Sequence, residues 1–339
     1  MLTVLFSVTL PANTQIFMFS MMRLSNFDVY NTEDALHSIF HLSETKPFNA
    51  IFDQAGYQTS NFIIESGTLL FLIAGIFALL VLRLLIILAL HNMRGNWCTN
   101  RLRRRINLNV SFVRYMLESC LCLGLVAGIS LLDEKSYTND KFADKVSMLL
   151  AILQLIVLIL TTFYFAYAAI KFFPIYKNKE EQGDVDPKES KYFGMFKNLR
   201  MDKKMALFSN VIFMVRRLAL VIILTLSMNR PLTQIFIYGF LSSLALIYAI
   251  MVCPYEERLL NIAEITNEVF IALLAYHLCL MTDYMVDFET ELHIGWSCIV
   301  LMLLNFAFNI IVFLIALVIK TRRGFKKWSG KRAVKKAIA

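Results

Sequence analysis

Charged residues are scarce in this sequence. Asp, Glu, Lys and Arg together make up 17% of the 339 residues, whereas soluble domains contain about a quarter. Hydrophobic residues reach 58% and the mean hydropathy is +0.60, which excludes a water-soluble domain. The long apolar runs also lack the even alternation of outer-membrane strands. The sequence therefore predicts an all-α, polytopic membrane protein whose spanning elements are helices.

Catalytic and metal-binding motifs are missing as well. The sequence holds no Ser/His/Asp grouping, nucleotide-binding loop, C-x-x-C or close Cys/His set. His277 is the only histidine well inside an apolar run, and it lies about half a helical turn off the face of Glu268. His277 is therefore predicted to be a satisfied core residue. We expect a protein that is not an enzyme and holds no metal or cofactor.

The basic residues are unevenly distributed. Of the 34 Lys and Arg residues, five lie in 94–105 and nine in 320–336, and both clusters directly follow apolar runs. This placement predicts cytosolic anchors that meet anionic lipids, rather than a nucleic-acid site. The loops alternate between basic or mixed and acidic or short, so the C-terminus is predicted to be cytosolic.

The apolar runs divide the chain into four regions. In order, these are a weak or partial N-terminal membrane segment (1–22), an extracytosolic ordered loop (23–61), a helical domain with seven strong transmembrane spans (62–320) and a basic cytosolic tail (321–339). The third strong span, 142–173, is expected to end at Pro174. The stretch 175–204 is expected to be a solvated cytosolic linker, with a regulatory site as the alternative.

Hydrogen-bonding and ionisable residues interrupt the last two predicted spans. Glu264 and Glu268 are four residues apart, so on a helix they share one face. Two carboxylates this close in a low dielectric cannot both remain ionised without a cation or a basic partner. Asn267 lies beside them on the same span. Asn305 and Asn309 repeat the four-residue spacing on the next span, where they can hydrogen-bond to a neighbouring helix.

Arg216 and Arg217 lie deeper in their span than interfacial anchors do. Their depth matches that of the two glutamates, so one of them is predicted to neutralise Glu264 or Glu268 across neighbouring helices. The alternative is that the arginines extend to the lipid headgroups while the glutamates are protonated or bind a cation.

The predicted span 111–132 carries two further patterns. Arg114 and Glu118 are four residues apart and are predicted to satisfy each other as a pair. Gly124 and Gly128 form the small-residue pattern that permits close helix contact, either within one chain or between copies of it.

Short motifs spread over the chain resemble one family. They are NFD at 26–28, Tyr57 with NFI at 61–63 and Gly67, RRL at 216–218, PYE…LLN…E…NE…YH…TD from 254 to 283, and GW…N from 295 to 305. This pattern resembles the C-terminal multi-pass module of the large cysteine-rich transmembrane proteins of ciliates and related protists, which are distantly TRP-channel-like. Members of that family carry a long extracellular cysteine-rich region and a further helix before the NFD segment. We therefore expect this chain to be a short paralogue or a fragment.

Two functions from different classes fit these features. The polar and charged residues named above lie in the inner halves of the spans, and together with Arg83 they form a polar layer. This layer and the family resemblance favour a TRP-like channel or a receptor-type transmembrane module. The same polar groups favour, as the alternative, a structural or assembly subunit in which a buried ion-pair network fixes helix register. The outer halves of the spans are almost entirely apolar, so a pore requires a homo-oligomer or a larger membrane complex.

Overall fold

The computed structural model describes residues 5–8, 10–25, 36, 38, 47–57, 59–67, 81, 85, 108–133, 141–181, 195, 196, 198–227, 230–282 and 287–338. In these residues the helices are α1 (Ala12–Ser25), α3 (Ala50–Gln54), α4 (Phe62–Glu65), α7 (Leu108–Leu132), α9 (Phe142–Glu181), α10 (Lys204–Leu207), α11 (Ser209–Leu226), α12 (Pro231–Val252), α13 (Arg258–Leu280) and α14 (Phe288–Ile338). The same residues contain no strand, and their only β pairing is an isolated bridge between Leu199 and Tyr255. The all-helical prediction is confirmed for the described residues.

Six helices in the described part of the chain, α7, α9 and α11 to α14, are long and apolar enough to cross a membrane. A hydrocarbon core of about 30 Å needs about 20 residues of helix. The predicted count of seven is not confirmed, because the first span of the predicted domain, expected over 62–90 from its apolar run, lies mostly outside the described residues. In the N-terminal region, α1 has 14 residues, which is shorter than a spanning helix.

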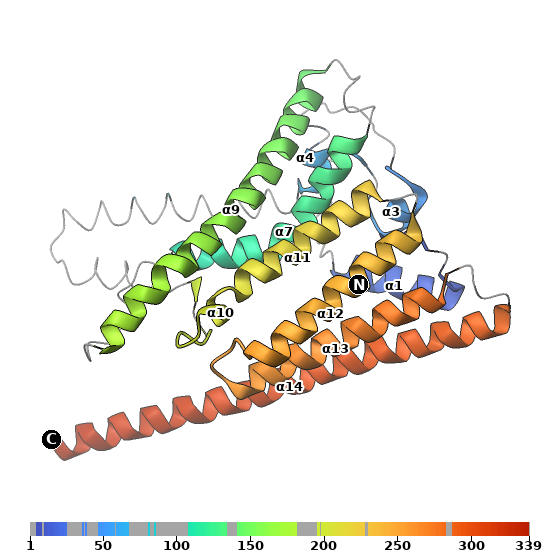
Figure 1. The fold of residues 1–339 in the computed structure, drawn as a ribbon. Coiled ribbons are helices and arrows are strands. Elements are labelled where there is room, and N and C mark those ends of the chain that lie inside the picture. The colour runs from blue at the N-terminus through green and yellow to red at the C-terminus, as the bar shows by residue number, and fades with distance from the viewer. Residues whose placement is uncertain are drawn as a thin grey trace.

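The six long helices form two groups of three (Figure 1). In the first group, α7 packs against both α9 and α11, and in the second, α13 packs against both α12 and α14. Among the described residues, the most extensive packing between the groups joins α11 to α12. The C-terminal end of α14, drawn in red, extends well beyond the other helices.

Among the described residues, two large clusters of buried apolar side chains form the core, and a small third cluster contains Leu36, Ile63 and Ile64. One large cluster includes Leu125, Leu224 and Leu278 and therefore draws on both helix groups. The other, which includes Phe172 and Met214, belongs to the first group. Only 22% of the span of α9 and 11% of that of α14 are buried within the chain. Their outward faces remain apolar, as expected for helices that contact lipid.

Pro174 does not end α9, so this prediction from the sequence was wrong. The helix continues through the proline to Glu181. Proline has no N–H group to bond the carbonyl of Ile170, so the helix loses one hydrogen bond at this point. Side chains on both sides of the proline pack in one cluster, since Phe172 is buried there and its ring lies 6.0 Å from that of Tyr176, and this packing offsets the lost bond.

The prediction of a solvated linker over 175–204 was also wrong at its C-terminal end. Met195, Phe196 and Leu199 are buried within the core cluster of the first group. The ring of Phe196 lies 5.1 Å from that of Phe172 in α9. These side chains are apolar, so burying them against the bundle is favourable despite the charged residues around them.

Gly124 and Gly128 of α7 face α11 in the same chain. A Cβ atom on Gly124 would lie 3.1 Å from Val221 Cγ2, and one on Gly128 would lie 2.9 Å from Thr225 Cγ2. The absence of side chains at these positions lets the two helix backbones approach closely. Of the two arrangements that the sequence leaves open, the structure contains the contact within one chain.

The short helix α1 packs against α14. Its residues Thr14, Met18 and Met22 are buried, at the four-residue spacing of one helix face. Asn13 Nδ2 donates a hydrogen bond of 3.1 Å to a backbone carbonyl of α14. A Cβ atom on Gly295 would collide with Oδ1 of Asn13 and would lie 2.7 Å from Oγ1 of Thr14. Gly295 is therefore the point at which α1 and α14 meet without room for a side chain.

Gly295→Ala is expected to loosen the contact between α1 and α14. The added methyl group collides with the side chains of Asn13 and Thr14, so the hydrogen bond from Asn13 Nδ2 to α14 must break or rearrange. Overpacking of this kind costs about 1 to 3 kcal/mol, and amide hydrogen exchange in α1 should accelerate about tenfold. Gly239→Ala is the control, because its Cβ would meet only Ala275 at 3.9 Å. Unchanged protection of α1 in Gly295→Ala would contradict this account.

Candidate functional site

A polar cavity lies between the two helix groups. Its volume is about 190 Å³, enough for several water molecules. Residues of α7, α11, α12 and α13 line it, together with the loop that follows α12. Its polar and charged lining residues are Glu118, Ser209, Asn210, Arg216, Arg217, Tyr248, Tyr255, Glu264 and Glu268.

Arg216 and Glu268 form an ion pair at this cavity. Arg216 Nη1 donates to both carboxylate oxygens of Glu268, at 2.5 and 2.6 Å. The side chain of Arg216 is 20% exposed and that of Glu268 is 5% exposed. Both residues lie near the middle of their helices, so the pair is far from either end of the spans and is screened little by solvent. The structure thus brings together one of the predicted Arg/Glu combinations.

Arg217 points to a different helix. Its Nη1 donates to the backbone carbonyls of Leu117 at 2.7 Å and of Glu118 at 3.3 Å, both in α7. Its guanidinium carbon lies 4.0 Å from the centre of the Phe213 ring, which adds a cation–π interaction. Successive helical residues point about 100° apart, so α11 directs Arg216 to α13 and Arg217 to α7. The two arginines therefore tie α11 to both helix groups.

Glu264 lies one turn before Glu268 on α13 and lines the same cavity. Its side chain is half-buried, and within the described part of the chain its carboxylate forms no hydrogen bond or ion pair. Arg216 is engaged by Glu268 and Arg217 by α7. A carboxylate in this position is a ready acceptor for a cation, a proton or water.

A short loop after α12 contributes Pro254 and Tyr255 to the wall of the polar cavity. Asn261 holds the loop, because its Nδ2 donates to the Tyr255 carbonyl at 2.7 Å and its Oδ1 accepts from Tyr255 N at 2.8 Å. On α12, Tyr248 Oη donates to the Met205 carbonyl at 2.7 Å. Sequence reasoning did not assign these residues to the site. Asn261 was the available signal, since it is a polar residue one turn into an apolar span.

Three asparagines join α13 to α14. Asn309 Nδ2 donates to Asn267 Oδ1 at 2.8 Å, and Asn267 Nδ2 donates to Asn309 Oδ1 at 3.2 Å. Asn309 Nδ2 also lies 2.8 Å from Oδ1 of Asn305, one turn earlier on α14. Asn267 therefore points to α14 while its neighbour Glu268 points to α11. Reciprocal amide bonds between two spanning helices fix their relative register.

The other sequence-predicted residues are placed as follows. Glu118 lines the polar cavity with an exposed side chain. The side chain of Arg114 and the residue Arg83 lie outside the described residues, and so does the predicted Arg114–Glu118 pair. His277 Nδ1 donates to a carbonyl of its own helix at 2.9 Å, and its Nε2 accepts from Ser297 Oγ at 3.0 Å. Both ring nitrogens of His277 are thus satisfied.

Compared with known proteins, the chain matches no protein-family model, no curated protein and no solved structure. Its class follows from its own architecture. Six helices of the described residues are long and apolar enough to cross a membrane, in an all-helical fold, and they make the chain a multi-pass integral membrane protein. The resemblance to the ciliate transmembrane proteins stays a prediction. Among the described residues no group of His, Cys, Asp and Glu is arranged to hold a metal ion.

Proposed function

We propose that this protein is a TRP-like channel or receptor-type transmembrane module and that the polar cavity is its working site. One observation carries the proposal. The Arg216–Glu268 pair joins the two helix groups, and the carboxylate of Glu264 lines the same cavity without a hydrogen bond or salt bridge in the described residues. A cation at Glu264 changes the electrostatic field at the neighbouring pair, and so favours one arrangement of the two groups over another.

Cation flux in reconstituted protein tests this proposal. Proteoliposomes that enclose a sodium-sensitive dye should admit Na⁺ at least about tenfold faster than protein-free liposomes, and Glu264→Gln should lose most of this flux. A receptor that does not conduct should instead show a rise in unfolding temperature with Na⁺ or Ca²⁺ that Glu264→Gln abolishes. Ser243→Ala is the control, because the Ser243 hydroxyl is exposed and bonds only a carbonyl of its own helix. A wild type with neither flux nor a cation response would exclude both forms of the proposal.

A structural or assembly subunit is the second candidate. The observation that favours it is that the polar contacts described above close within one chain, from Arg216 to α13, from Arg217 to α7 and from Asn309 to α13. Such contacts fix helix register without any transport activity. For a structural subunit, Glu264→Gln should leave the flux and the cation dependence of unfolding unchanged.

The proposed partners are the lipid bilayer, anionic lipids at the basic clusters and further copies of this chain. The outward faces of α9 and α14 present large apolar surfaces, which contact acyl chains or a second copy. A homo-oligomer in mild detergent should have a mass that is a multiple of 39.1 kDa, as measured by light scattering. A protein mass of a single chain would contradict self-association.

We also propose that the C-terminus faces the cytosol. Cysteines placed at Thr138 and Glu289 should then react with an impermeant maleimide in intact cells. Cysteines at Ser190 and Ser329 should react only after permeabilisation, because basic and mixed loops remain on the cytosolic side. Labelling of Ser190→Cys in intact cells would overturn the assignment.

A further inference from the structure

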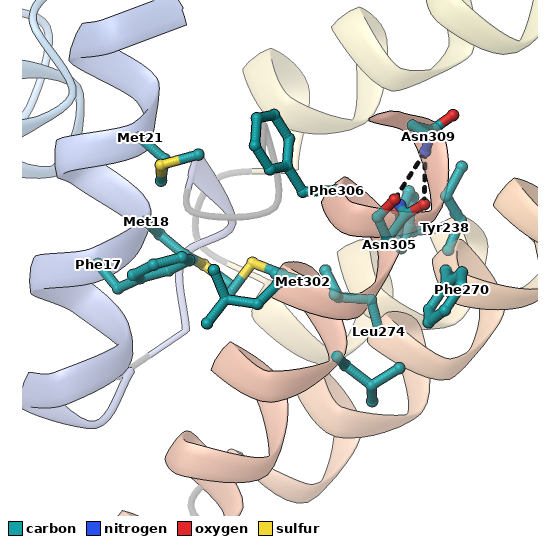
Figure 2. Close-up of a pocket in the computed structure, with 13 residues that line it drawn as sticks. Phe17, Met18, Met21, Tyr238, Phe270, Leu274, Met302, Asn305, Phe306 and Asn309 are labelled. Carbon is teal, nitrogen blue, oxygen red and sulfur yellow. Dashed lines mark hydrogen bonds between the residues drawn. The ribbon is translucent and has the colours of Figure 1, made fainter. Parts of the chain in front are cut away.

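A second cavity lies apart from the polar one, between α1, α12, α13 and α14 (Figure 2). Its volume is also about 190 Å³. Figure 2 shows Phe17, Met18 and Met21 of α1 on one side, facing Met302 and Phe306 of α14. No charged side chain lines it among the described residues, and apart from two asparagines its walls are aromatic, methionine, leucine and isoleucine side chains. We call it the apolar cavity.

The apolar cavity lies deep in the membrane-crossing part of the fold. Asn305 is midway along the span Phe288–Arg322 of α14, so a ligand reaches the cavity through the acyl chains rather than from water. For comparison, an apolar cavity of about 150 Å³ stays dry and binds benzene. The cavity therefore has room for an aromatic ring, and the flexible side chains of Met18 and Met302 adapt to the shape of an occupant.

One hydrogen-bond donor at the end of this cavity is unused. Asn309 Nδ2 lies 2.8 Å from Asn305 Oδ1 and 2.9 Å from the Asn305 carbonyl, and Figure 2 marks these contacts with dashed lines. Asn305 lines the cavity and its side-chain oxygen accepts from Asn309, so its amide nitrogen remains as a donor. That nitrogen donates to no other residue in the described part of the chain. An amide N–H without an acceptor is costly in hydrocarbon.

The unused donor restricts the class of occupant. Acyl chains carry no acceptor, and the polar groups of phospholipids lie at the membrane surface rather than at the depth of Asn305. A charged ligand does not fit, since no described side chain of opposite charge lines the cavity. The occupant that matches both the walls and the donor is an uncharged apolar molecule with one acceptor oxygen.

We infer that the apolar cavity binds uncharged, membrane-soluble molecules of the aromatic ketone or ester class. The amide nitrogen of Asn305 donates to the carbonyl oxygen of the ligand, and the apolar body packs between Met18 of α1 and Met302 and Phe306 of α14. This site is independent of the proposed function, because Glu264 and the Arg216–Glu268 pair line the polar cavity instead.

Benzophenone tests the inference directly. It is an uncharged aromatic ketone that forms covalent bonds with nearby C–H groups under near-ultraviolet light. Protein in lipid nanodiscs is illuminated with benzophenone and digested, and the labelled residues are identified by mass spectrometry. Labelling should concentrate at Met18, Met302 and Phe306. Asn305→Leu, which keeps the size of the side chain but removes the donor, should lower this labelling about fivefold, the weight of one net hydrogen bond. Ser243→Ala should leave it unchanged.

A second variant covers the case in which Asn305→Leu does not fold. Met302→Trp fills the cavity while keeping Asn305, and should abolish the labelling. Diphenylmethane, which has the same two rings without the oxygen, should compete about fivefold less well than an aromatic ketone. Labelling spread evenly over the outward faces of α9 and α14 would mean partition into lipid only and would overturn the inference. Labelling at the cavity that persists unchanged in Asn305→Leu would also overturn it, because the acceptor oxygen would then have no role.

Discussion

Glu268→Gln is expected to lower the free energy of unfolding by about 3 kcal/mol. The substitution removes the charge that Arg216 Nη1 contacts at 2.5 and 2.6 Å. It leaves the guanidinium, which is 20% exposed, in the middle of the bundle without the carboxylate that accepts its hydrogen bonds, and among the described residues only the more distant charge of Glu264 on α13 then faces it. An unpaired charge near the centre of a spanning helix costs at least about 2.5 kcal/mol on insertion scales. Unfolding of the purified protein in detergent measures this decrease in the free energy of unfolding.

Glu264→Gln is the matched control for this prediction. It is the same substitution one turn earlier on α13, where no ion pair forms in the described residues, and it should change the free energy of unfolding by less than about 1 kcal/mol. Arg216→Gln combined with Glu268→Gln should recover part of the loss, with a coupling energy of about 1 to 3 kcal/mol. A coupling energy of zero would contradict the ion pair and would favour a proton or cation bound at the glutamates.

Gly128→Leu should destabilise the protein by about 3 kcal/mol, at the upper end of the cost of overpacking. Even a methyl group at this position would lie 2.9 Å from Thr225 Cγ2. Thr225 cannot easily rotate away, because it is β-branched and its Oγ1 donates to the Val221 carbonyl at 2.7 Å. The larger leucine side chain must therefore separate α7 from α11. Thermal unfolding and the yield of monodisperse protein report the effect.

The loss of stability in Gly128→Leu should come from the steric clash with α11 and not from the replacement of a glycine as such. Gly128→Ala should cost about 1 kcal/mol. Gly239→Ala meets only Ala275, at 3.9 Å, and should be neutral or stabilising by up to about 1 kcal/mol, because alanine favours the helix. If Gly128→Leu unfolds like the parent protein, the close contact between α7 and α11 does not exist.

The fold class and part of the polar site can be predicted from the amino-acid sequence alone. Hydropathy locates the spans, because each must cover the hydrocarbon thickness. A charged side chain inside the membrane needs a partner of opposite charge at the same depth. For this reason an arginine of α11 and a glutamate of α13 were predicted to form a pair. Which two meet depends on the rotation of each helix, and sequence depth alone cannot choose between Arg216 and Arg217.

Other features depend on packing that the sequence does not express. Proline often ends a helix, but α9 continues through Pro174, because Phe172 before it and Tyr176 after it pack in the same cluster. The burial of Phe196 depends on the position of Phe172 on another segment. The contact of α1 with Gly295 joins residues almost the whole chain apart, and no local pattern marks it.

The length of α14 gives the Asn267–Asn309 contact a mechanical meaning. The helix has 51 residues and continues without interruption to Ile338, and its contact with α13 at Asn309 lies within the bilayer-crossing part. From Asn309 to Ile338 the helix extends about 43 Å at about 1.5 Å per residue. A tilt of about 10° around the asparagine contact would move Ile338 sideways by roughly 8 Å for a helix of that rise. The asparagine contact would then be the pivot of the tilt. A small change in the angle of α14 inside the membrane would produce a large displacement of its C-terminal end outside the membrane.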